Sequence, residues 1–195
     1  MILGSHQSAA GGVDRVWERA RRDRADCVQL WTRSSRQWAS KPLAASTLAA
    51  FAAARAEGPM PTAAHASYLI NLGAINDAIY ERSIATLLEE CQRADQLGVD
   101  AVVLHPGAAV GTTEQAAIAR TQAALAIVIK RLGKQSRVRI LIENTAGMGS
   151  SIGCSLPQIA AILDGLPVAK LGVCLDTQHL FASGYDWTTA RGYKG

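Results

Sequence analysis

The sequence lacks the apolar runs and the cysteine spacings that mark several classes of protein. No apolar stretch approaches the roughly 20 residues that a membrane-spanning helix needs, and the N-terminal apolar run is too short for a signal peptide. The four cysteines show no CxxC spacing, which argues against a disulfide scaffold and against a zinc ribbon. We therefore expect a cytoplasmic protein without a membrane partner, whose thiols are reduced.

A glycine-rich phosphate loop is also missing. The first apolar stretch is followed by HQSAAGG, which is not GxGxxG and has no P-loop lysine. The sequence contains no linker rich in Pro or Ser, and its net charge of +4 favours polyanion binding only weakly. Hydrophobic residues make up 49% of the 195 residues, so we expect one packed domain over residues 1–195.

Short apolar runs alternate along the chain with longer helix-like segments. The strand candidates are Ile2–His6, Cys27–Thr32, Met60–His65, Ala101–His105, Arg139–Glu143 and Gly172–Asp176. The amphipathic segments between them are Leu43–Arg55, Ile79–Leu97, Glu114–Leu132 and Leu156–Leu163. This alternation is typical of repeated βα units. Because the phosphate loop of an open doubly wound sheet is missing, we predict an α/β fold of the TIM (β/α)8 type.

Histidines and carboxylates recur where the strand candidates end. The residues at or just after these ends are His6, His65, His105, Glu143, Asp176 and His179. The carboxyl ends of barrel strands meet at one mouth, so we expect these side chains to form a ring of metal ligands. Imidazoles and carboxylates without thiolates suit zinc, manganese or iron, and zinc is our first choice. Glu143 has two oxygens and could bridge two ions.

Six segments together resemble the endonuclease IV family, the zinc-dependent apurinic/apyrimidinic endonucleases of base-excision repair, also called AP endonuclease family 2. They are GSHQSAAGG, RSSRQW, HASYLINL, LHPGAAVG, ILIENTAGMGSSIG and GVCLDTQHLFASGYD. The segments follow the family's order and spacing to about Asp186. The resemblance implies a xylose-isomerase-like TIM barrel with a trinuclear zinc cluster. Such an enzyme cleaves double-stranded DNA on the 5′ side of an abasic site and leaves a 3′-hydroxyl.

The resemblance also implies roles for single residues. His65, His105 and Glu143 match the ligands of the first zinc, and Glu143, which also bridges to the second zinc, is the candidate catalytic residue. Asp176 matches a ligand of the second zinc, and His179 matches one of the third. His6 matches a histidine near the barrel mouth that is not a ligand, so the resemblance removes it from the ring.

Two further segments match loops that enter the DNA duplex at the lesion. The residues in these loops are Arg36, Gln37, Tyr68 and Leu69. An enzyme that acts on an abasic nucleotide rotates it out of the stack, and an inserted side chain fills the gap. Without the resemblance, RSSRQW would be interpreted as an ordinary loop and Tyr68 as a core residue.

The sequence departs from the family pattern after GYD, where the family continues through two more strands and their helices. Those parts would supply a further His and Glu for the second zinc and an Asp-x-His pair for the third. We therefore expect about six βα units with the last two missing, and only the first zinc site with all its ligands. Open sheet edges could promote self-association in a family that is usually monomeric. Without the missing ligands the chain could be inactive, so membership of the family and catalytic activity are separate expectations.

Three functions fit these patterns. The first is a hydrolase of DNA phosphodiesters, in which zinc polarises the phosphodiester and a metal-bound hydroxide attacks in line. The second is a divalent-metal sugar isomerase or epimerase on a similar barrel, and the third is a non-catalytic remnant that binds DNA weakly. RSSRQW and HASYLINL favour the first function, because they match the repair family's DNA loops.

Overall fold

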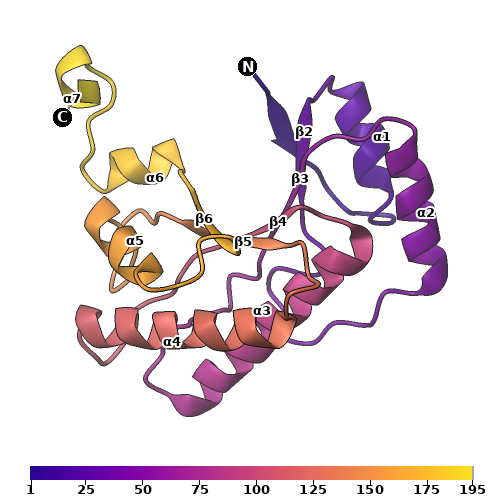
Figure 1. Ribbon diagram of the computed structural model, residues 1–195. Helices are drawn as coiled ribbons and strands as arrows, with labels where there is room; N and C mark the ends of the chain where they lie inside the picture. The colour runs from indigo at the N-terminus through magenta and orange to yellow at the C-terminus, as the bar shows by residue number, and fades with distance from the viewer. Residues whose placement is uncertain (195) are drawn as a thin grey trace.

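Six parallel strands form one curved sheet in the computed structural model, which describes residues 1–194 (Figure 1). The strands are β1 (Gly4–His6), β2 (Cys27–Leu30), β3 (Thr62–His65), β4 (Ala101–Leu104), β5 (Arg139–Glu143) and β6 (Leu171–Cys174). Strands that follow one another in the chain are neighbours in the sheet, in the order β1 to β6. A doubly wound sheet would reverse its strand order at a switch point, so the predicted TIM-barrel arrangement is confirmed. Gly195 of the predicted domain lies outside the described residues.

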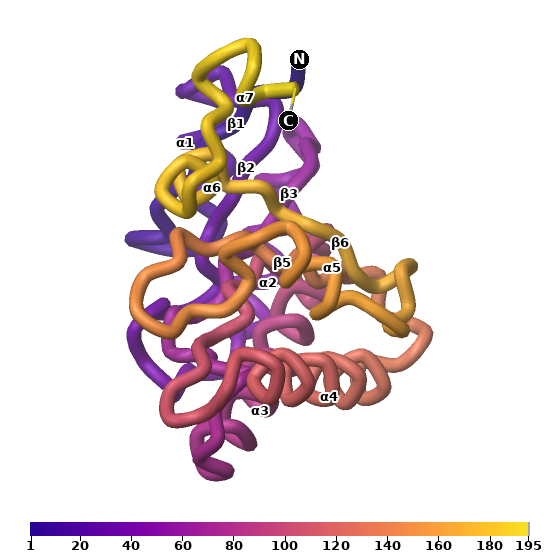
Figure 2. Tube along the Cα trace, turned by 90° about the vertical axis from the view of Figure 1, so that its left-hand side faces the viewer, coloured from indigo at the N-terminus to yellow at the C-terminus, as the bar shows by residue number. Residues whose placement is uncertain are grey.

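Helices follow the strands, and all but the last two lie along one side of the sheet (Figure 1). They are α1 (Arg15–Arg22), α2 (Ala45–Ala56), α3 (Asp77–Leu97), α4 (Glu114–Leu132), α5 (Leu156–Leu163), α6 (Thr177–Ala182) and α7 (Ala190–Lys194). Figure 1 shows α1 and α2 on the right of the curved sheet, α3 and α4 below it, and α5 on the left. Figure 2, turned by 90°, again shows α3 and α4 together below the strands. This arrangement leaves the opposite face of the sheet as the barrel interior.

The central strands are the most deeply buried strands of the sheet. Val102, Val103 and Leu104 of β4 are at most 3% exposed, and Ile140 and Ile142 of β5 are at most 1% exposed. A parallel strand between a helix layer and a barrel interior needs apolar residues on both sides, which explains the continuous apolar runs in the sequence. The predicted strands are confirmed, although all except Arg139–Glu143 are shorter than predicted at one end.

Side-chain caps fix where four of the helices begin. Asn76, Thr113, Ser155 and Asp176 each accept a hydrogen bond from a backbone N–H in the first turn of α3, α4, α5 and α6, respectively. Each capping residue ends a loop that begins at the carboxyl end of a strand. Each of these loops is therefore held by a strand at one end and by a capped helix at the other. None of the described helices has the length and the apolar character that crossing a membrane requires.

The sheet is open within residues 1–194. β1 pairs only with β2, and β6 pairs only with β5. Val173 of β6 is 42% exposed, whereas the apolar residues of β4 and β5 are covered. The inner strands are therefore held from two sides and the two edge strands from one.

Candidate metal centre

Three side chains from neighbouring strands meet at the carboxyl end of the sheet. His65 ends β3, His105 directly follows β4, and Glu143 ends β5. Oε2 of Glu143 lies 3.3 Å from Nε2 of His65 and 3.0 Å from Nε2 of His105. These residues, which we call the inner triad, each offer a ligand atom within 4.8 Å of the other two. Residues far apart in the sequence become neighbours because parallel strands present their ends at one edge.

A second group shares the same carboxylate. Nδ1 of His179 lies 3.7 Å from Oε1 of Glu143 and 3.6 Å from Oδ2 of Asp176. We call Glu143, Asp176 and His179 the outer triad; their ligand atoms also lie within 4.8 Å of one another. Asp176 is the N-cap of α6, and its Oδ1 accepts a hydrogen bond of 2.8 Å from the backbone N–H of His179. The outer triad is thus built around the first turn of a short helix.

Backbone carbonyls orient two of the imidazoles. Nδ1 of His65 lies 2.7 Å from the carbonyl oxygen of Ala66, and Nδ1 of His179 lies 2.9 Å from that of Asn144. A carbonyl only accepts hydrogen bonds, so we assign the ring proton to Nδ1 in both residues, which leaves a lone pair on Nε2. This is the tautomer in which a histidine binds a metal through Nε2.

The carboxylate of Glu143 fits a bound cation. Its Oε2 is buried and accepts no hydrogen bond of regular geometry, although two Nε2 atoms lie close to it. In the assigned tautomer, the lone pair on Nε2 of His65 faces this anionic oxygen, an arrangement that repels unless a cation or a proton lies between them. Two imidazoles and one carboxylate form a donor set that zinc accepts. The residues present therefore fit a metal ion.

The same contacts shift the pKa values of Glu143 and His65. Burial alone would raise the pKa of Glu143, but the adjacent His105 and His65 outweigh burial and lower this pKa to about 2. Burial lowers the pKa of His65, but Glu143 and the Ala66 carbonyl outweigh it and raise the pKa above its usual value. The carboxylate is therefore anionic at neutral pH, as a metal ligand must be.

His6 is the exception among the four strand-end histidines. Its ring stacks against Trp31 with 3.9 Å between the ring centroids, and it belongs to neither triad. Burial lowers the pKa of His6, and the charge of His65 lowers it further. The ring of ligands inferred from strand ends alone is wrong at this position, because β1 is the edge strand and lies two strands away from β3.

The four residues predicted to contact DNA lie on two loops at the same end of the sheet. Arg36 and Gln37 are exposed on the loop between β2 and α2. Tyr68 is 52% exposed and Leu69 is half-buried on the loop between β3 and α3. The interpretation of Tyr68 as a core residue is therefore wrong, since half of its surface is open to solvent.

Hydrogen bonds join these two loops to each other beside the inner triad. The carbonyl oxygen of Ser35 accepts a hydrogen bond of 3.1 Å from the backbone N–H of Tyr68 and one of 2.9 Å from Oγ of Ser67. The ring of Tyr68 lies 5.0 Å from that of His65 and 5.9 Å from that of His105, measured between centroids. An exposed aromatic side chain therefore borders the metal-ligand cluster.

Two asparagines that sequence reasoning missed organise the loops. Asn144 binds Asp176 twice: its Oδ1 accepts from the Asp176 N–H at 2.7 Å, and its Nδ2 donates to the Asp176 carbonyl at 3.1 Å. Asn71 does the same for Ala108, so it ties the loop after β3 to the loop after β4. Gly107 has a φ of +126°, and a Cβ there would overlap Asn71. Their positions within HASYLINL and IENTAG were the signal that could have revealed them.

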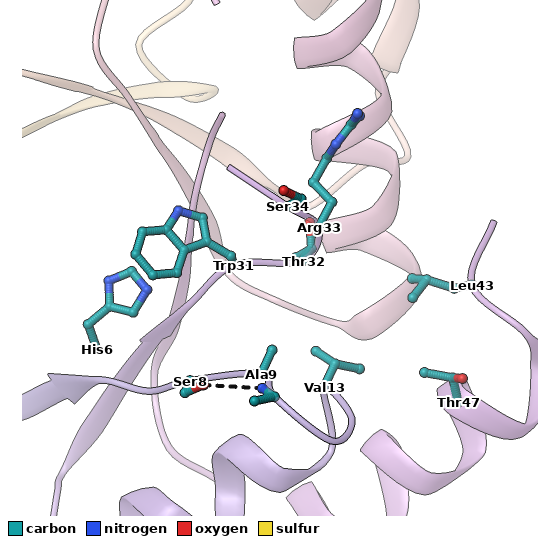
Figure 3. Close-up of a pocket in the computed structure, with 11 residues that line it drawn as sticks. His6, Ser8, Ala9, Val13, Trp31, Thr32, Arg33, Ser34, Leu43 and Thr47 are labelled. Carbon is teal, nitrogen blue, oxygen red and sulfur yellow. Dashed lines mark hydrogen bonds between the residues drawn. The ribbon is translucent and has the colours of Figure 1, made fainter. Parts of the chain in front are cut away.

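Two pockets flank the cluster. One of about 340 Å³ lies between Tyr68, His105 and His179. The other, of about 800 Å³, lies between the loops that follow β1 and β2, and Figure 3 shows His6 and Trp31 side by side at one end of it. The smaller pocket opens directly onto both triads, so it is the one that a substrate of this centre would enter.

The sequence matches a family described as a xylose isomerase-like TIM barrel over residues 17–194. The chain is 40% identical to a protein named probable endonuclease 4 from Halorhodospira halophila, over 98% of this chain and 65% of that protein. It is 41% identical to a protein of the same name from Nitratidesulfovibrio vulgaris, over 99% of this chain and 68% of that protein. The chain thus spans about two thirds of the length of these relatives.

Solved structures are also similar to this chain. The crystal structure of endonuclease IV from Thermus thermophilus is similar to this chain with a TM-score of 0.81 and 36% identity, over 93% of this chain and 64% of that one. A D-tagatose 3-epimerase-like protein is similar with a TM-score of 0.77 over 99% of this chain and 72% of that one, but at 13% identity. The second likeness shows a shared fold alone.

Proposed function

The chain belongs to the endonuclease IV family of xylose isomerase-like TIM barrels, and we propose that it acts in base-excision repair as a hydrolase of DNA at abasic sites. The bond cleaved would be the phosphodiester on the 5′ side of the lesion. One observation carries the proposal: the buried, unpartnered Oε2 of Glu143 faces two imidazoles directly beside the exposed ring of Tyr68. A metal-ligand cluster and a side chain that can enter a duplex thus share one mouth.

We propose that the two triads hold zinc. His65, His105 and Glu143 would bind the first ion, and the second oxygen of Glu143 would join Asp176 at a second ion. Because Nδ1 of His179 is used by the Asn144 carbonyl, its Nε2 remains for a third ion. Zinc bound by these residues would supply Lewis-acid stabilisation of the phosphodiester and a hydroxide nucleophile at neutral pH.

Residues of the protein prepare this site to bind a cation. Glu143 stays anionic because its pKa is held near 2, so no proton competes for its oxygens at neutral pH. The carbonyls of Ala66 and Asn144 fix the rings of His65 and His179, so no ordering of these rings is needed when an ion binds. Glu143 is the candidate catalytic residue, because it alone belongs to both triads.

We propose that Arg36, Gln37, Tyr68 and Leu69 contact the DNA at the lesion. An abasic site lacks a base to stack, so the ring of Tyr68 and the long side chain of Arg36 could occupy the space left when the nucleotide rotates out. The hydrogen bonds at Ser35 join the two loops, so both insertions would act on the same nucleotide. Specificity for abasic sites would arise from the low cost of unstacking a nucleotide without a base.

The test is a nicking assay on a duplex with one tetrahydrofuran abasic analogue at a defined position. With zinc, we expect a single nick on the 5′ side of the analogue that leaves a 3′-hydroxyl, and a chelator should abolish it. The same duplex without the analogue is the control. Cleavage that is absent, independent of metal or independent of the lesion would contradict the proposal, and metal-dependent turnover of a ketose would favour an epimerase.

A further inference from the structure

The loop between β2 and α2 is folded around two buried arginines. Arg33 donates hydrogen bonds to the carbonyl oxygens of Gln37 and Trp38. Arg93, on α3, donates to the carbonyl oxygen of Thr32 at 2.6 Å and to that of Lys41 at 2.8 Å. This loop has no helix or strand to satisfy its carbonyls, so the guanidinium groups replace those partners. Figure 3 shows Arg33 extending from the loop along the neighbouring helix.

Two consecutive glutamates of α3 complete the cluster. Glu89 accepts a hydrogen bond of 2.8 Å from Arg33 and another from Oγ of Ser40. Glu90 accepts a hydrogen bond of 2.9 Å from the backbone N–H of Ser67, which precedes Tyr68. One helix turn therefore contacts the loop that carries Arg36 and the loop that carries Tyr68.

Burying these charged side chains costs free energy, so filling space alone does not explain why they are there. Glu90 is 1% exposed, Arg93 is 8% exposed, and the side chain of Arg33 is 1% exposed. Burying charged groups is expensive unless partners compensate, and apolar residues of the same volume often stabilise a protein at least as well. What apolar residues cannot do is hold four backbone carbonyls and one backbone N–H of two irregular loops.

We propose that Arg33, Glu89, Glu90 and Arg93, which we call the loop quartet, position the two loops for the recognition of abasic DNA. They fix Arg36 and Tyr68 relative to each other before DNA binds, so that little conformational entropy is lost on binding. All four are positioning residues, since they act through the loops and do not reach the DNA themselves. This inference rests on the proposed function and identifies residues that would contribute to its specificity for abasic DNA.

Three variants test the quartet. Glu90→Ala removes the acceptor for the Ser67 N–H, whereas Glu90→Gln keeps an acceptor of the same shape. Arg33→Met keeps a long side chain but removes the donors to Gln37 and Trp38. The matched control is Val128→Ala, which creates a cavity at a fully buried position of α4, away from both loops.

The first readout is tryptic cleavage after Arg36, followed by mass spectrometry, which requires no enzymatic activity. We expect cleavage at least about tenfold faster in Glu90→Ala and Arg33→Met than in the control, because the loop opens more often. Glu90→Gln should restore protection. Cleavage after Arg36 that is as slow in both variants as in Val128→Ala would overturn the proposal.

The second readout is the affinity for the tetrahydrofuran duplex divided by that for the intact duplex, measured by fluorescence anisotropy with zinc present. We expect the ratio to fall about tenfold in Glu90→Ala and Arg33→Met with unchanged zinc content, and Glu90→Gln to restore it. An unchanged ratio in a variant whose loop is cleaved faster would also overturn the proposal. If the unaltered chain shows no preference for the abasic duplex, the proposed function fails, and protease protection alone decides whether the quartet holds the loops.

Discussion

The inner and outer triads share Glu143 but depend on different kinds of structure. His65, His105 and Glu143 come from three adjacent strands, each paired on both sides, and His65 and Glu143 are 7% and 6% exposed. Asp176 and His179 come from the N-cap and the first turn of α6, which has no buried residue. The side chain of Asp176 is 32% exposed. A sheet therefore fixes the inner triad, and one helix cap fixes most of the outer one.

This difference determines what each triad requires to keep its shape. Inner-triad geometry follows from the register of β3, β4 and β5, in which His65 pairs with Val103 and Leu104 pairs with Ile142. Outer-triad geometry follows from the two hydrogen bonds between Asn144 and Asp176 and from the capping bond to His179. The inner triad should thus persist under changes that disturb the outer one. Changes to the inner triad should disturb the outer triad only when they alter Glu143, the residue that both share.

The largest effect should come from Glu143→Gln, because Glu143 belongs to both triads. The variant loses the anionic oxygens that both triads share, so both groups should bind metal poorly. Mutation of a residue that only hydrogen-bonds to a metal ligand already costs about 10- to 100-fold in metal affinity. Because Glu143 is itself a ligand, we expect a loss of more than about 100-fold. Zinc titration against a chelating indicator measures it. Zinc binding equal to that of the unaltered chain would show that neither triad is a metal site.

The next largest effect should come from His65→Ala, which removes one ligand of the inner triad only. We expect the zinc content to fall by about one ion per chain and lesion cleavage to fall with it. The matched control is His6→Ala, which removes another strand-end histidine that lies in neither triad. Equal loss of metal in both variants would indicate that the effect arises from altered packing and not from a lost ligand.

A smaller effect should come from Asp176, where two variants separate the cap from the ligand. Asp176→Ala removes both roles, and the loss of an N-cap costs about 1 kcal/mol. Asp176→Asn keeps a good cap but removes the charge. We expect both variants to lose metal at the outer triad while the inner triad keeps its ion, and only the alanine variant to melt at a lower temperature. Loss of all bound metal from Asp176→Asn would show that the inner triad does not stand alone.

The strand pattern was sufficient to predict that His65, His105 and Glu143 lie together with other strand-end residues, because all of them lie where apolar strands end. A parallel sheet brings such ends together, so His65, His105 and Glu143 could be grouped before any coordinates were known. The same rule wrongly included His6, since an apolar run does not reveal which strand lies at the edge of the sheet. The division of the ligands among separate ions came from the family resemblance and not from the strand pattern.

Features built from short-range or buried polar contacts could not be predicted. The run GVCLDTQH was interpreted as a strand as far as Asp176, whereas β6 ends at Cys174 and Asp176 caps α6. A helix of six residues has too few turns to show an apolar face. Glu90 lies within an amphipathic segment, and a charged residue almost never becomes fully buried without partners that only the fold brings near it.

The last prediction concerns the pH dependence of stability and Glu90, which lies below the loop that follows His65. Burial raises the pKa of Glu90 to about 7, against the lowering effects of the Ser67 N–H, Arg33 and Arg93, while Glu89 raises it further. Between the unfolded pKa of 4.5 and this value, the unfolded chain releases the proton and the folded chain keeps it. Stability should therefore be greatest at low pH and fall as pH rises through this window.

Glu90→Gln isolates this contribution, because its amide does not ionise. In the presence of a chelator, we expect the unaltered chain to lose on the order of 2 kcal/mol relative to the variant between pH 5 and pH 8. Urea unfolding at a series of pH values measures the difference. Curves for Glu90→Gln and the unaltered chain that stay parallel would contradict a raised pKa of Glu90.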